Sequence, residues 1–439
     1  MTNQLMDQLL GLIEARTATI GVVGLGYVGL PLVLLFEEAG FPVLGFDVDE
    51  QKTAKLARGE SYIRHIGEER IQRAFGGRAE ATTNFARLSE CDAIIVCVPT
   101  PLGEHREPDL KYIRVTAETI ARVIRRGQVI VLESTTYPGT TREELLPRFE
   151  ATGLKCGTDF FLGFSPERED PGNERFSTKN IPKVVGGIDA DSLRAAAALY
   201  GAAVDHVVPV SSAEVAESAK LLENIFRAVN IALVNEMKVV FDRMGINVWE
   251  VIEAAKTKPF GFMPFYPGPG LGGHCIPLDP FYLTWKAAEY GVWARFIELA
   301  GEVNTSMPRY VVDRVTEAVN RAGKSILGAT VLVLGLSYKP DIDDDRESPS
   351  FELIELLQER GAKVSYCDPF IPEARRGRKH DLGLKSVPCT ADEFAKYDVV
   401  LVSTPHSAFK DASLYGKAKL VVDTRNIVGA DAAEKVVRA

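Results

Sequence analysis

A glycine-rich segment in the second half of the chain carries the residues best suited to covalent chemistry. Residues 268–279 read Gly-Pro-Gly-Leu-Gly-Gly-His-Cys-Ile-Pro-Leu-Asp. Glycines let a ligand approach the backbone closely. Cys275 is the one cysteine of six that lies outside a strand-like apolar run or an element end. Its thiolate is a candidate nucleophile, with Asp279 four residues further on. The same pattern also fits a small buried cysteine in a structural loop.

Candidate acid and base groups stand at three other places. Lys220 and Asn224 are spaced i and i+4 in a helical pattern and therefore project from one face. A partly desolvated lysine can transfer protons, and an asparagine can donate to an oxyanion. Ser165-Pro166-Glu167 and Glu133-Ser134-Thr135 each follow an apolar run, at the strand end where open α/β sheets place ligands. Taken alone, Lys220 and Asn224 also fit a solvated polar stripe.

The motif Gly24-Leu25-Gly26-Tyr27-Val28-Gly29 follows an apolar run and opens a helical pattern. This is the context that a dinucleotide fingerprint requires, and Asp47 stands 18 residues beyond Gly29. The glycines allow the tight turn, the approach of the pyrophosphate to backbone N–H groups, and close packing of helix on strand. Asp47 should accept hydrogen bonds from the ribose hydroxyls and repel a 2′-phosphate, which favours NAD over NADP. An ordinary tight βα turn is the alternative.

A second, degenerate turn follows near the C-terminus. The run Val333-Leu334-Gly335-Leu336-Ser337-Tyr338-Lys339 keeps only the first glycine, so close approach of a pyrophosphate is not expected. Asp368 ends the next strand as Asp47 does in the first unit. Lys339 and Arg346 suggest a nucleotide whose phosphates are met by side chains. They also fit two surface cations beside the acidic run 341–345.

These motifs require a scaffold of strands that alternate with helices. We expect strands at 18–23, 42–46, 93–98, 129–132, 160–164, 183–185, 331–336, 363–366, 399–403 and 420–422. We expect helices at 3–15, 30–39, 211 to about 245 with Ser211 and Glu214 as a capping box, 249–255, 282–322 and 350–360, with a loop at 259–280. The alternation predicts an α/β protein with two Rossmann-like, doubly wound parallel-sheet domains, joined by a long central helix and an all-helical middle domain. The predicted limits are 1–16 for an N-terminal helix, 17–210 for the NAD-binding domain, 211–325 for the helical domain and 326–439 for the C-terminal domain.

Composition excludes several classes of protein. The 439 residues are 46% hydrophobic and 25% charged, as in ordinary globular chains. The net charge of −9 argues against a general nucleic-acid binder. No stretch approaches the ~18 apolar residues of a membrane span, and the N-terminus lacks a secretory signal. The six cysteines show no metal-ligand spacing, so we expect reduced thiols, no metal and a cytoplasmic setting.

Together these motifs resemble the UDP-glucose/UDP-N-acetylhexosamine 6-dehydrogenase family, four-electron enzymes that oxidise a nucleotide sugar to its uronic acid. The resemblance runs from about Ala18 to the C-terminus. It rests on 24–29, Val98-Pro99-Thr100-Pro101, 133–135, 165–167, Lys220 with Asn224, 272–275 with Asp279, and Asp344-Asp345-Arg346-Glu347-Ser348.

The resemblance implies roles for the catalytic candidates. Lys220, with Asp279 and a water, helps to remove the proton of the hydroxyl on carbon 6 as the first NAD takes hydride. Cys275 attacks the aldehyde, and Lys220 and Asn224 hold the oxyanion of the thiohemiacetal. A second NAD takes hydride and leaves a thioester, which water hydrolyses with help from Glu167 and Asp279. Thr135 joins the catalytic positions.

The resemblance also implies binding positions and partners. Those for NAD are Gly24, Gly26, Tyr27, Val28, Gly29, Asp47, Lys52, Pro99, Thr100, Glu133, Thr135 and Arg346. Those for the UDP-sugar are Glu167, Arg168, Lys220, Asn224, Tyr266, Gly270, Gly272, Gly273, Tyr338 and Lys339, and Arg346 matches a position of this kind too. The site is expected to close between the two α/β units, and the helical middle is expected to form a homodimer interface. No nucleic-acid or membrane partner is expected.

The substrate branch is indicated by two segments. Residues 258–270 and 166–173 resemble the branch that acts on UDP-N-acetylhexosamines, especially UDP-N-acetylglucosamine in surface-polysaccharide pathways. An acetamido group suits an aromatic, proline-lined loop. UDP-N-acetylmannosamine, UDP-N-acetylgalactosamine and UDP-glucose are the alternative substrates. The rival classes are a two-electron hydroxyacid dehydrogenase, which does not need Cys275, and a non-enzymatic NAD-binding protein, which would be expected to lose one of Lys220, Asn224, Cys275 and Glu167.

Overall fold

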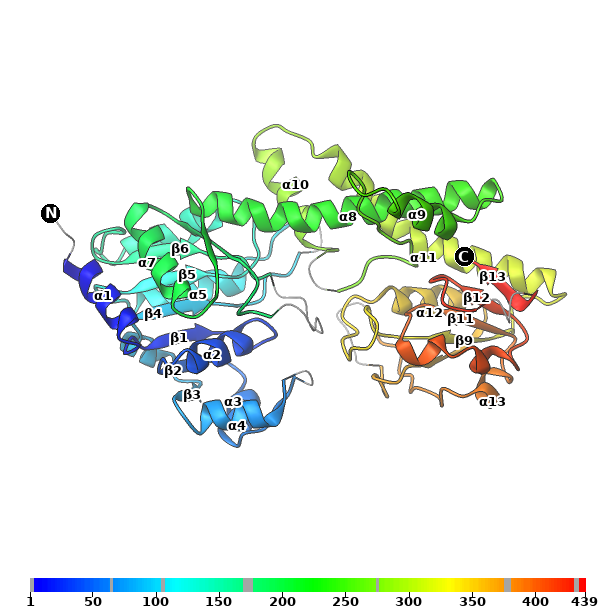
Figure 1. The fold of residues 1–439 in the computed structure, drawn as a ribbon, viewed down its shortest axis with the longest axis horizontal. Helices are drawn as coiled ribbons and strands as arrows, with labels where there is room; N and C mark the ends of the chain where they lie inside the picture. Colours follow the sequence, from blue (N-terminus) through cyan, green and yellow to red (C-terminus); the bar gives the residue numbers. More distant parts are fainter. Residues whose placement is uncertain are drawn as a thin grey trace. The chain divides into compact units, whose positions relative to one another are not determined.

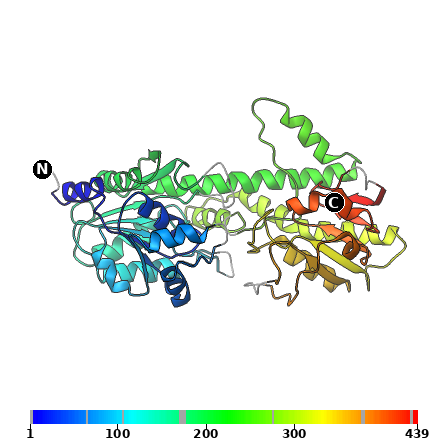
Figure 2. The same ribbon diagram turned by 60° about the horizontal axis from the view of Figure 1, so that its bottom comes forward.

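The chain forms two compact units. The computed structural model describes residues 4–63, 66–103, 107–168, 177–273, 276–374, 380–429 and 434–439. The first unit comprises Met1–Glu223 with Phe281–Val292, and the second comprises Asn224–Pro280 with Trp293–Ala439. The division falls inside α8 (Ala213–Arg243), which Figure 2 shows as one continuous helix. The four domain limits given above stay a prediction.

The first unit is built on an eight-stranded sheet of order β3-β2-β1-β4-β5-β6-β7-β8 (Figure 1). Its strands are β1 (Ile20–Val23), β2 (Val43–Phe46), β3 (Ala79–Thr82), β4 (Ala93–Val96), β5 (Val129–Leu132), β6 (Phe161–Phe164), β7 (Lys183–Gly187) and β8 (Val207–Pro209). The first six strands follow the Rossmann order, with the switch point between β1 and β4. The expected all-parallel sheet needs one correction, because β7 runs antiparallel to β6. An antiparallel neighbour needs no helical crossover.

Helices of this unit pack on the sheet and on one another. They are α1 (Gln4–Glu14), α2 (Gly29–Glu38), α3 (Glu50–Ala57), α4 (Glu68–Phe75), η1 (Phe85–Glu90), α5 (Lys111–Ala121), η2 (Thr141–Leu145), α6 (Leu146–Glu150), α7 (Ala190–Gly201) and most of α10 (Asp279–Glu289). The run from Gly29 to Phe36 in α2 is wholly buried, because this helix packs into the core beside β1 and β2. The nucleotide turn therefore stands between two rigid elements.

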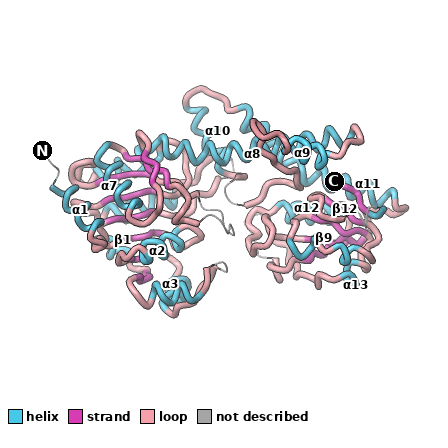
Figure 3. The backbone as a smooth tube through the Cα atoms, viewed as in Figure 1, coloured by secondary structure: helices cyan, strands magenta, loops and turns pink. Residues whose placement is uncertain are grey.

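The second unit holds a five-stranded, fully parallel sheet of order β10-β9-β11-β12-β13. Its strands are β9 (Thr330–Leu334), β10 (Lys363–Cys367), β11 (Val399–Val402), β12 (Val421–Asp423) and β13 (Val436–Arg438). Its helices are α9 (Val248–Lys256), α11 (Arg295–Arg321), α12 (Pro349–Glu359), α13 (Ala391–Phe394), η3 (Ser407–Lys410) and η4 (Ala412–Tyr415), with the C-terminal part of α8. Apolar clusters fill both faces of the sheet, and Figure 3 shows its strands enclosed by helices and loops. The switch point lies between β9 and β11.

The helical region differs from expectation at two points. The helix expected over 282–322 is two helices, because Gly291 takes φ +70 after α10 and Val292 N donates to Ala287 O, a C-terminal cap. The cap of α8 is Ser212 rather than Ser211, since the Ser212 Oγ accepts from Val215 N at 3.3 Å. Glu214 pairs with Arg142 instead of completing a capping box.

The cysteines correct the expectation of reduced thiols for one pair. Cys367 at the end of β10 is bonded to Cys389, with 5.7 Å between their Cα atoms. The bond forms because the segment around Ser386 lies alongside the end of β10, where Val387 N donates to Tyr366 O. Cys91, Cys97 and Cys156 are free thiols. Within the described ranges, no helix has both the length and the apolar character that a membrane crossing requires.

Candidate active site

Three glycines shape the nucleotide turn after β1, and each serves a different purpose. Gly24 has φ +93, and a Cβ there would lie 2.6 Å from the Cys97 carbonyl oxygen. A Cβ on Gly29 would overlap the Gly24 carbonyl oxygen. A Cβ on Gly26 would meet nothing within 4 Å. Gly24 and Gly29 are therefore required by the fold, whereas Gly26 borders open space at the N-terminus of α2, where a pyrophosphate would fit.

Asp47 lies at the end of β2 beside this turn. Its Oδ2 accepts from Leu25 N at 2.9 Å, and its Oδ1 accepts from Asp49 N at 3.0 Å. The Lys52 ammonium stands 3.1 Å from the same carboxylate, so the two predicted ribose-side residues are neighbours. Tyr62, which sequence reasoning missed, donates from its hydroxyl to Leu25 O at 2.6 Å. Burial, helped by the Asp47 carboxylate, raises the pKa of Tyr62 and keeps it a neutral donor.

The loops after β4 and β5 are joined at the same edge of the sheet. The Thr100 Oγ1 donates to Thr135 O at 2.7 Å, and the Ser134 Oγ donates to Val98 O at 2.7 Å. Pro99 lies between these two bonds. The Tyr282 hydroxyl donates to Thr100 O. Tyr27 and Val28 lie on the nearby glycine turn and pack partly against the core.

Glu133, one of the predicted cofactor contacts, is bound to two side chains of the same unit. Its carboxylate is buried, ion-paired to Lys183 at 2.8 Å, and hydrogen-bonded by the Tyr200 hydroxyl at 2.5 Å. Sequence reasoning missed Lys183 and Tyr200. Their polar groups are separated from Glu133 by 50 and 67 positions along the chain, so no local pattern joins them.

Lys220 and Glu167 come together in the first unit. The Lys220 ammonium, on α8, donates to the backbone carbonyl oxygen of Glu167. Arg168 pairs with Glu223 of α8 at 2.7 Å and donates to Pro182 O at 2.7 Å. The turn after β6 is thereby fastened to α8 at two points.

Asn224 and Asp279 come together in the second unit. The Asn224 Nδ2 donates to the Asp279 Oδ2 at 2.6 Å, and the two residues are 7% and 3% exposed. Burial makes such a bond stronger than it would be in water. Asn224 stands one helical turn after Lys220 on α8. The predicted nucleophile Cys275 lies outside the described residues.

The glycine-rich loop packs against the nucleotide turn of the second sheet. A Cβ on Gly272 would lie 2.6 Å from the Tyr338 Cβ. Gly273, with φ +83, would place a Cβ 2.9 Å from the Tyr338 ring, and its N–H donates to Arg346 O at 3.1 Å. A Cβ on Gly270 would meet Pro349 at 3.0 Å. These three predicted substrate glycines therefore let the loop lie directly on Tyr338 and its neighbours.

Arg425 is a further member of this region that the sequence did not reveal. It follows β12, and a Cβ on Gly268 would overlap its guanidinium group. Within the described part of the chain its side chain makes one hydrogen bond, from Nε to Ser403 O at 2.8 Å. Burial lowers the pKa of Arg425 to about 10, which leaves it charged at neutral pH. Its two Nη groups are available to an anion beside the glycine loop.

The turn after β9 has the same backbone features as the turn after β1, but different side chains pack around it. Gly335 has φ +88, and the Asp368 Oδ2 accepts from Leu336 N at 2.6 Å, as Asp47 does from Leu25. The buried His406 ring occupies the other side, with Nε2 3.1 Å from the Asp368 Oδ2 and 3.2 Å from the Ser337 Oγ. Because the His406 ring occupies this space, a nucleotide would be contacted by neighbouring side chains rather than by the backbone of a glycine turn.

Three other predicted residues have defined partners of their own. The Arg346 guanidinium pairs with Asp344 at 2.6 Å, and Lys339 O accepts from the Ser337 Oγ at 2.8 Å. Tyr266 stacks on Trp249 with ring centroids 5.9 Å apart, and its hydroxyl donates to Glu253 at 2.6 Å. The Tyr266 hydroxyl is therefore bound to α9.

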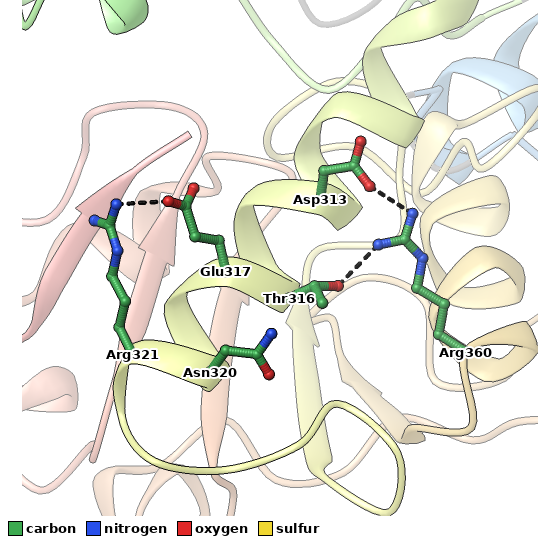
Figure 4. A pocket seen from close by; sticks show the side chains of 6 residues that line it. All are labelled: Asp313, Thr316, Glu317, Asn320, Arg321 and Arg360. Carbon is green, nitrogen blue, oxygen red and sulfur yellow. Dashed lines mark hydrogen bonds and ion pairs between the residues drawn. The ribbon is translucent and has the colours of Figure 1, made fainter.

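A surface hollow of about 510 Å³ lies between α11 and α12 (Figure 4). Its two arginines are already paired, Arg360 with Asp313 and Arg321 with Glu317, both at 2.5 Å. It contains none of the predicted site residues. In the portion of the chain that the structure describes, no group of three or more His, Cys, Asp and Glu residues could hold a metal ion.

A Rossmann sheet with an intact nucleotide turn and a second parallel sheet with a related turn are the features of a dinucleotide-binding protein with a second nucleotide-type unit. The sequence matches three domain models of one family. Residues 18–204 match the NAD binding domain, residues 214–306 the central domain and residues 332–430 the UDP binding domain. The chain belongs to the UDP-glucose/GDP-mannose dehydrogenase family, and its cofactor is NAD.

Relatives match over nearly the whole chain. Protein CapL of Staphylococcus aureus is 37% identical, covering 94% of this chain and 96% of that protein. UDP-N-acetyl-D-glucosamine 6-dehydrogenase of Pseudomonas aeruginosa is 36% identical, covering 91% and 93%. Among solved structures, a UDP-D-ManNAc dehydrogenase from Pyrococcus horikoshii superposes with a TM-score of 0.84 at 32% identity, covering 94% and 96%. Matches to the central and UDP binding domains argue against a two-electron hydroxyacid dehydrogenase.

Proposed function

We propose that this protein oxidises the 6-hydroxymethyl group of a UDP-N-acetylhexosamine to the uronic acid. The substrate that we propose is UDP-N-acetylglucosamine. The observation that carries the proposal is the arrangement on α8, where buried Lys220 is bound to Glu167 and buried Asn224, one turn later, is bound to Asp279. Taking an alcohol to a carboxylate removes four electrons, so two NAD molecules and one water are consumed for each sugar.

The residues divide the chemistry among themselves. NAD, when bound against Gly26 and beside Asp47, supplies the hydride acceptor. Lys220, with Asp279 and a water, takes the proton of the 6-hydroxyl. Cys275 adds to the aldehyde carbon, and Lys220 and Asn224 hold the resulting oxyanion. The thiohemiacetal would then give up its hydride to a second NAD and become a thioester. Glu167 and Asp279 assist the water that hydrolyses this thioester, which releases the uronic acid and frees the Cys275 sulfur for another turnover.

The UDP group is assigned to the second unit. Tyr338, Lys339 and Arg346 are the proposed contacts, and Arg425 is added because its Nη groups lie beside the glycine loop. Charged guanidinium groups suit a diphosphate. The choice of N-acetylglucosamine is supported by the Pseudomonas aeruginosa relative, and N-acetylmannosamine is the second candidate because of the Pyrococcus horikoshii structure.

A homodimer and a cellular setting complete the proposal. Phe226, Leu233 and Val240 recur every seven residues along α8 and are 47%, 52% and 41% exposed. An apolar stripe of this kind suits a second copy of the helix. Leu233→Glu should shift the mass in solution from dimer to monomer, and an unchanged dimer would contradict this assignment.

NAD and UDP-sugars are cytoplasmic metabolites, so we assign the reaction, and a role in surface-polysaccharide synthesis, to the cytoplasm.

The substrate assignment is tested by parallel kinetics. Purified protein with NAD would be given UDP-N-acetylglucosamine, UDP-N-acetylmannosamine, UDP-N-acetylgalactosamine and UDP-glucose, and NADH formation recorded. We expect the highest kcat/KM with UDP-N-acetylglucosamine. A preference for UDP-glucose would overturn the branch, and a preference for another N-acetylhexosamine would replace the epimer.

A further inference from the structure

A charged network is buried beneath the carboxyl ends of β5 and β6. The Glu133 and Lys183 side chains are 0% and 5% exposed, and their charged atoms lie 2.8 Å apart. Tyr200 donates to the second carboxylate oxygen, and the Lys183 ammonium lies 5.1 Å from the centre of the Tyr200 ring. Burying two charges costs several kcal/mol per ion, and apolar replacements of such pairs are often equally stable. Stability alone therefore gives a weak reason for this pair.

The network reaches the turn that bears Glu167. The Lys183 ammonium also donates to Pro166 O at 3.3 Å, and the Ser165 Oγ donates to Val184 O at 2.8 Å. The next carbonyl, that of Glu167, accepts from Lys220. Two ammonium groups thus hold consecutive carbonyls of one turn, and moving Pro166 would move the acceptor that orients Lys220.

The same network reaches the cofactor edge through the chain itself. Glu133 directly precedes Ser134 and Thr135, which bond to the loop after β4. Holding the Glu133 carboxylate in place therefore holds the start of the loop after β5. One buried ion pair ties together the loops after β5 and β6, which supply groups to the proposed hydride and proton transfers.

Electrostatics keep Lys183 charged in its buried position. Burial by itself would lower the pKa of Lys183, but the Glu133 and Glu167 carboxylates outweigh it and raise that pKa above its usual value. The Cys97 thiol faces the same group, and burial raises its pKa so that it stays neutral. Burial raises the pKa of Glu133 as well, although Lys183 opposes that rise. Lys183 is therefore the cation of the network, held in place by Glu133 and by Pro166 O.

We propose that Glu133, Lys183 and Tyr200 are positioning residues for Lys220 and Glu167, and that Glu133 acts through this network instead of contacting NAD. The inference rests on the proposed function, because it gives the network a role in the proton transfer assigned there to Lys220.

The test compares Lys183→Met, the double variant Glu133→Gln/Lys183→Met, and Lys238→Met. Lys238 is an equally buried lysine of α8, 6% exposed in its side chain, and among the described residues its ion-pair partner is Asp242, at 3.8 Å, which is not a proposed site residue. It controls for loss of a buried lysine. The double variant leaves neither member of the pair as an unpaired charge, so we expect it to fold even where Lys183→Met does not. Readouts are Tm, Kd for NAD, KM for the UDP-sugar, and kcat against pH.

We expect both Lys183 variants to lose about 10- to 100-fold in kcat, with Kd for NAD and KM for the sugar within about threefold of wild type. Their kcat–pH profile should shift, because Lys220 loses its fixed acceptor. Lys238→Met should lower Tm without shifting that profile. A double variant with the rate and pH profile of wild type would overturn the inference alone. A wild-type protein that oxidises no UDP-sugar would overturn the proposed function and the inference with it.

Discussion

Gly26 and Gly29 offer a matched pair of substitutions that separates NAD binding from folding. In Gly26→Ala the new methyl group meets nothing within 4 Å, so the free protein should keep its Tm within about 1 °C. The methyl would instead project toward the pyrophosphate, and we expect NAD affinity to fall at least about tenfold, or roughly 1.4 kcal/mol. In Gly29→Ala the Cβ overlaps the Gly24 oxygen and lies 3.0 Å from the Gly24 carbon, so backbone must move. Overpacking of this kind costs about 1–3 kcal/mol.

The assay is thermal unfolding of both variants with and without NAD, together with calorimetric titration of NAD. Wild type should gain Tm when NAD is added and Gly26→Ala should gain little, whereas Gly29→Ala should already have a lower Tm without NAD. Because mass action links the gain to Kd, titration and unfolding must agree. Wild-type NAD affinity in Gly26→Ala would refute the assignment of the cofactor to this turn.

Further predictions concern the second unit and pH. Gly273→Ala should raise KM for the UDP-sugar about tenfold and leave Kd for NAD unchanged, because a Cβ would meet the Tyr338 ring at 2.9 Å; equal losses for both ligands would contradict the division between units. Arg425→Gln should weaken binding of UDP about tenfold in calorimetry, through loss of a charge-assisted contact, and unchanged affinity would remove Arg425 from the site. Lys339→Ala should weaken UDP-sugar binding more than NAD binding in the same titrations. Burial raises the pKa of Glu217 to about 7, from 4.5, so the stability this group gives is complete below pH 4.5 and is lost as pH rises through 7. The free energy of unfolding of wild type, relative to Glu217→Gln, should therefore fall by an amount on the order of 3 kcal/mol between pH 4.5 and 8, and parallel curves would contradict the assignment.

The strands and turns that have a local sequence signal could be predicted from the sequence. The run Val129–Leu132 is apolar at every position, and the structure places β5 at those residues. The fingerprint at Gly24–Gly29 was readable because close packing and a positive φ leave few residue types possible. The strands β3 (Ala79–Thr82) and β8 (Val207–Pro209) were missed because they are short edge strands, partly exposed and without a continuous apolar run.

Contacts between distant residues could not be read in the same way. Lys183 sits at the start of a predicted strand, a usual place for an exposed lysine, and only the fold brings it to Glu133. In the sequence Arg425 resembles an ordinary loop cation, and only the structure shows that Gly268 lies against its guanidinium group. The reversal of β7 depends on pairing with β6, which apolar patterning does not encode. The candidate residues were thus predictable, but their partners required the tertiary structure.

The four-electron mechanism is tested most directly by the number of NADH molecules formed for each UDP-N-acetylglucosamine consumed, with Cys275→Ala as the control. We expect a ratio of two for the wild type, with the uronic acid as product. We expect no acid from Cys275→Ala, which should still bind NAD and UDP. A ratio of one, or acid formation without the Cys275 thiol, would contradict the four-electron mechanism.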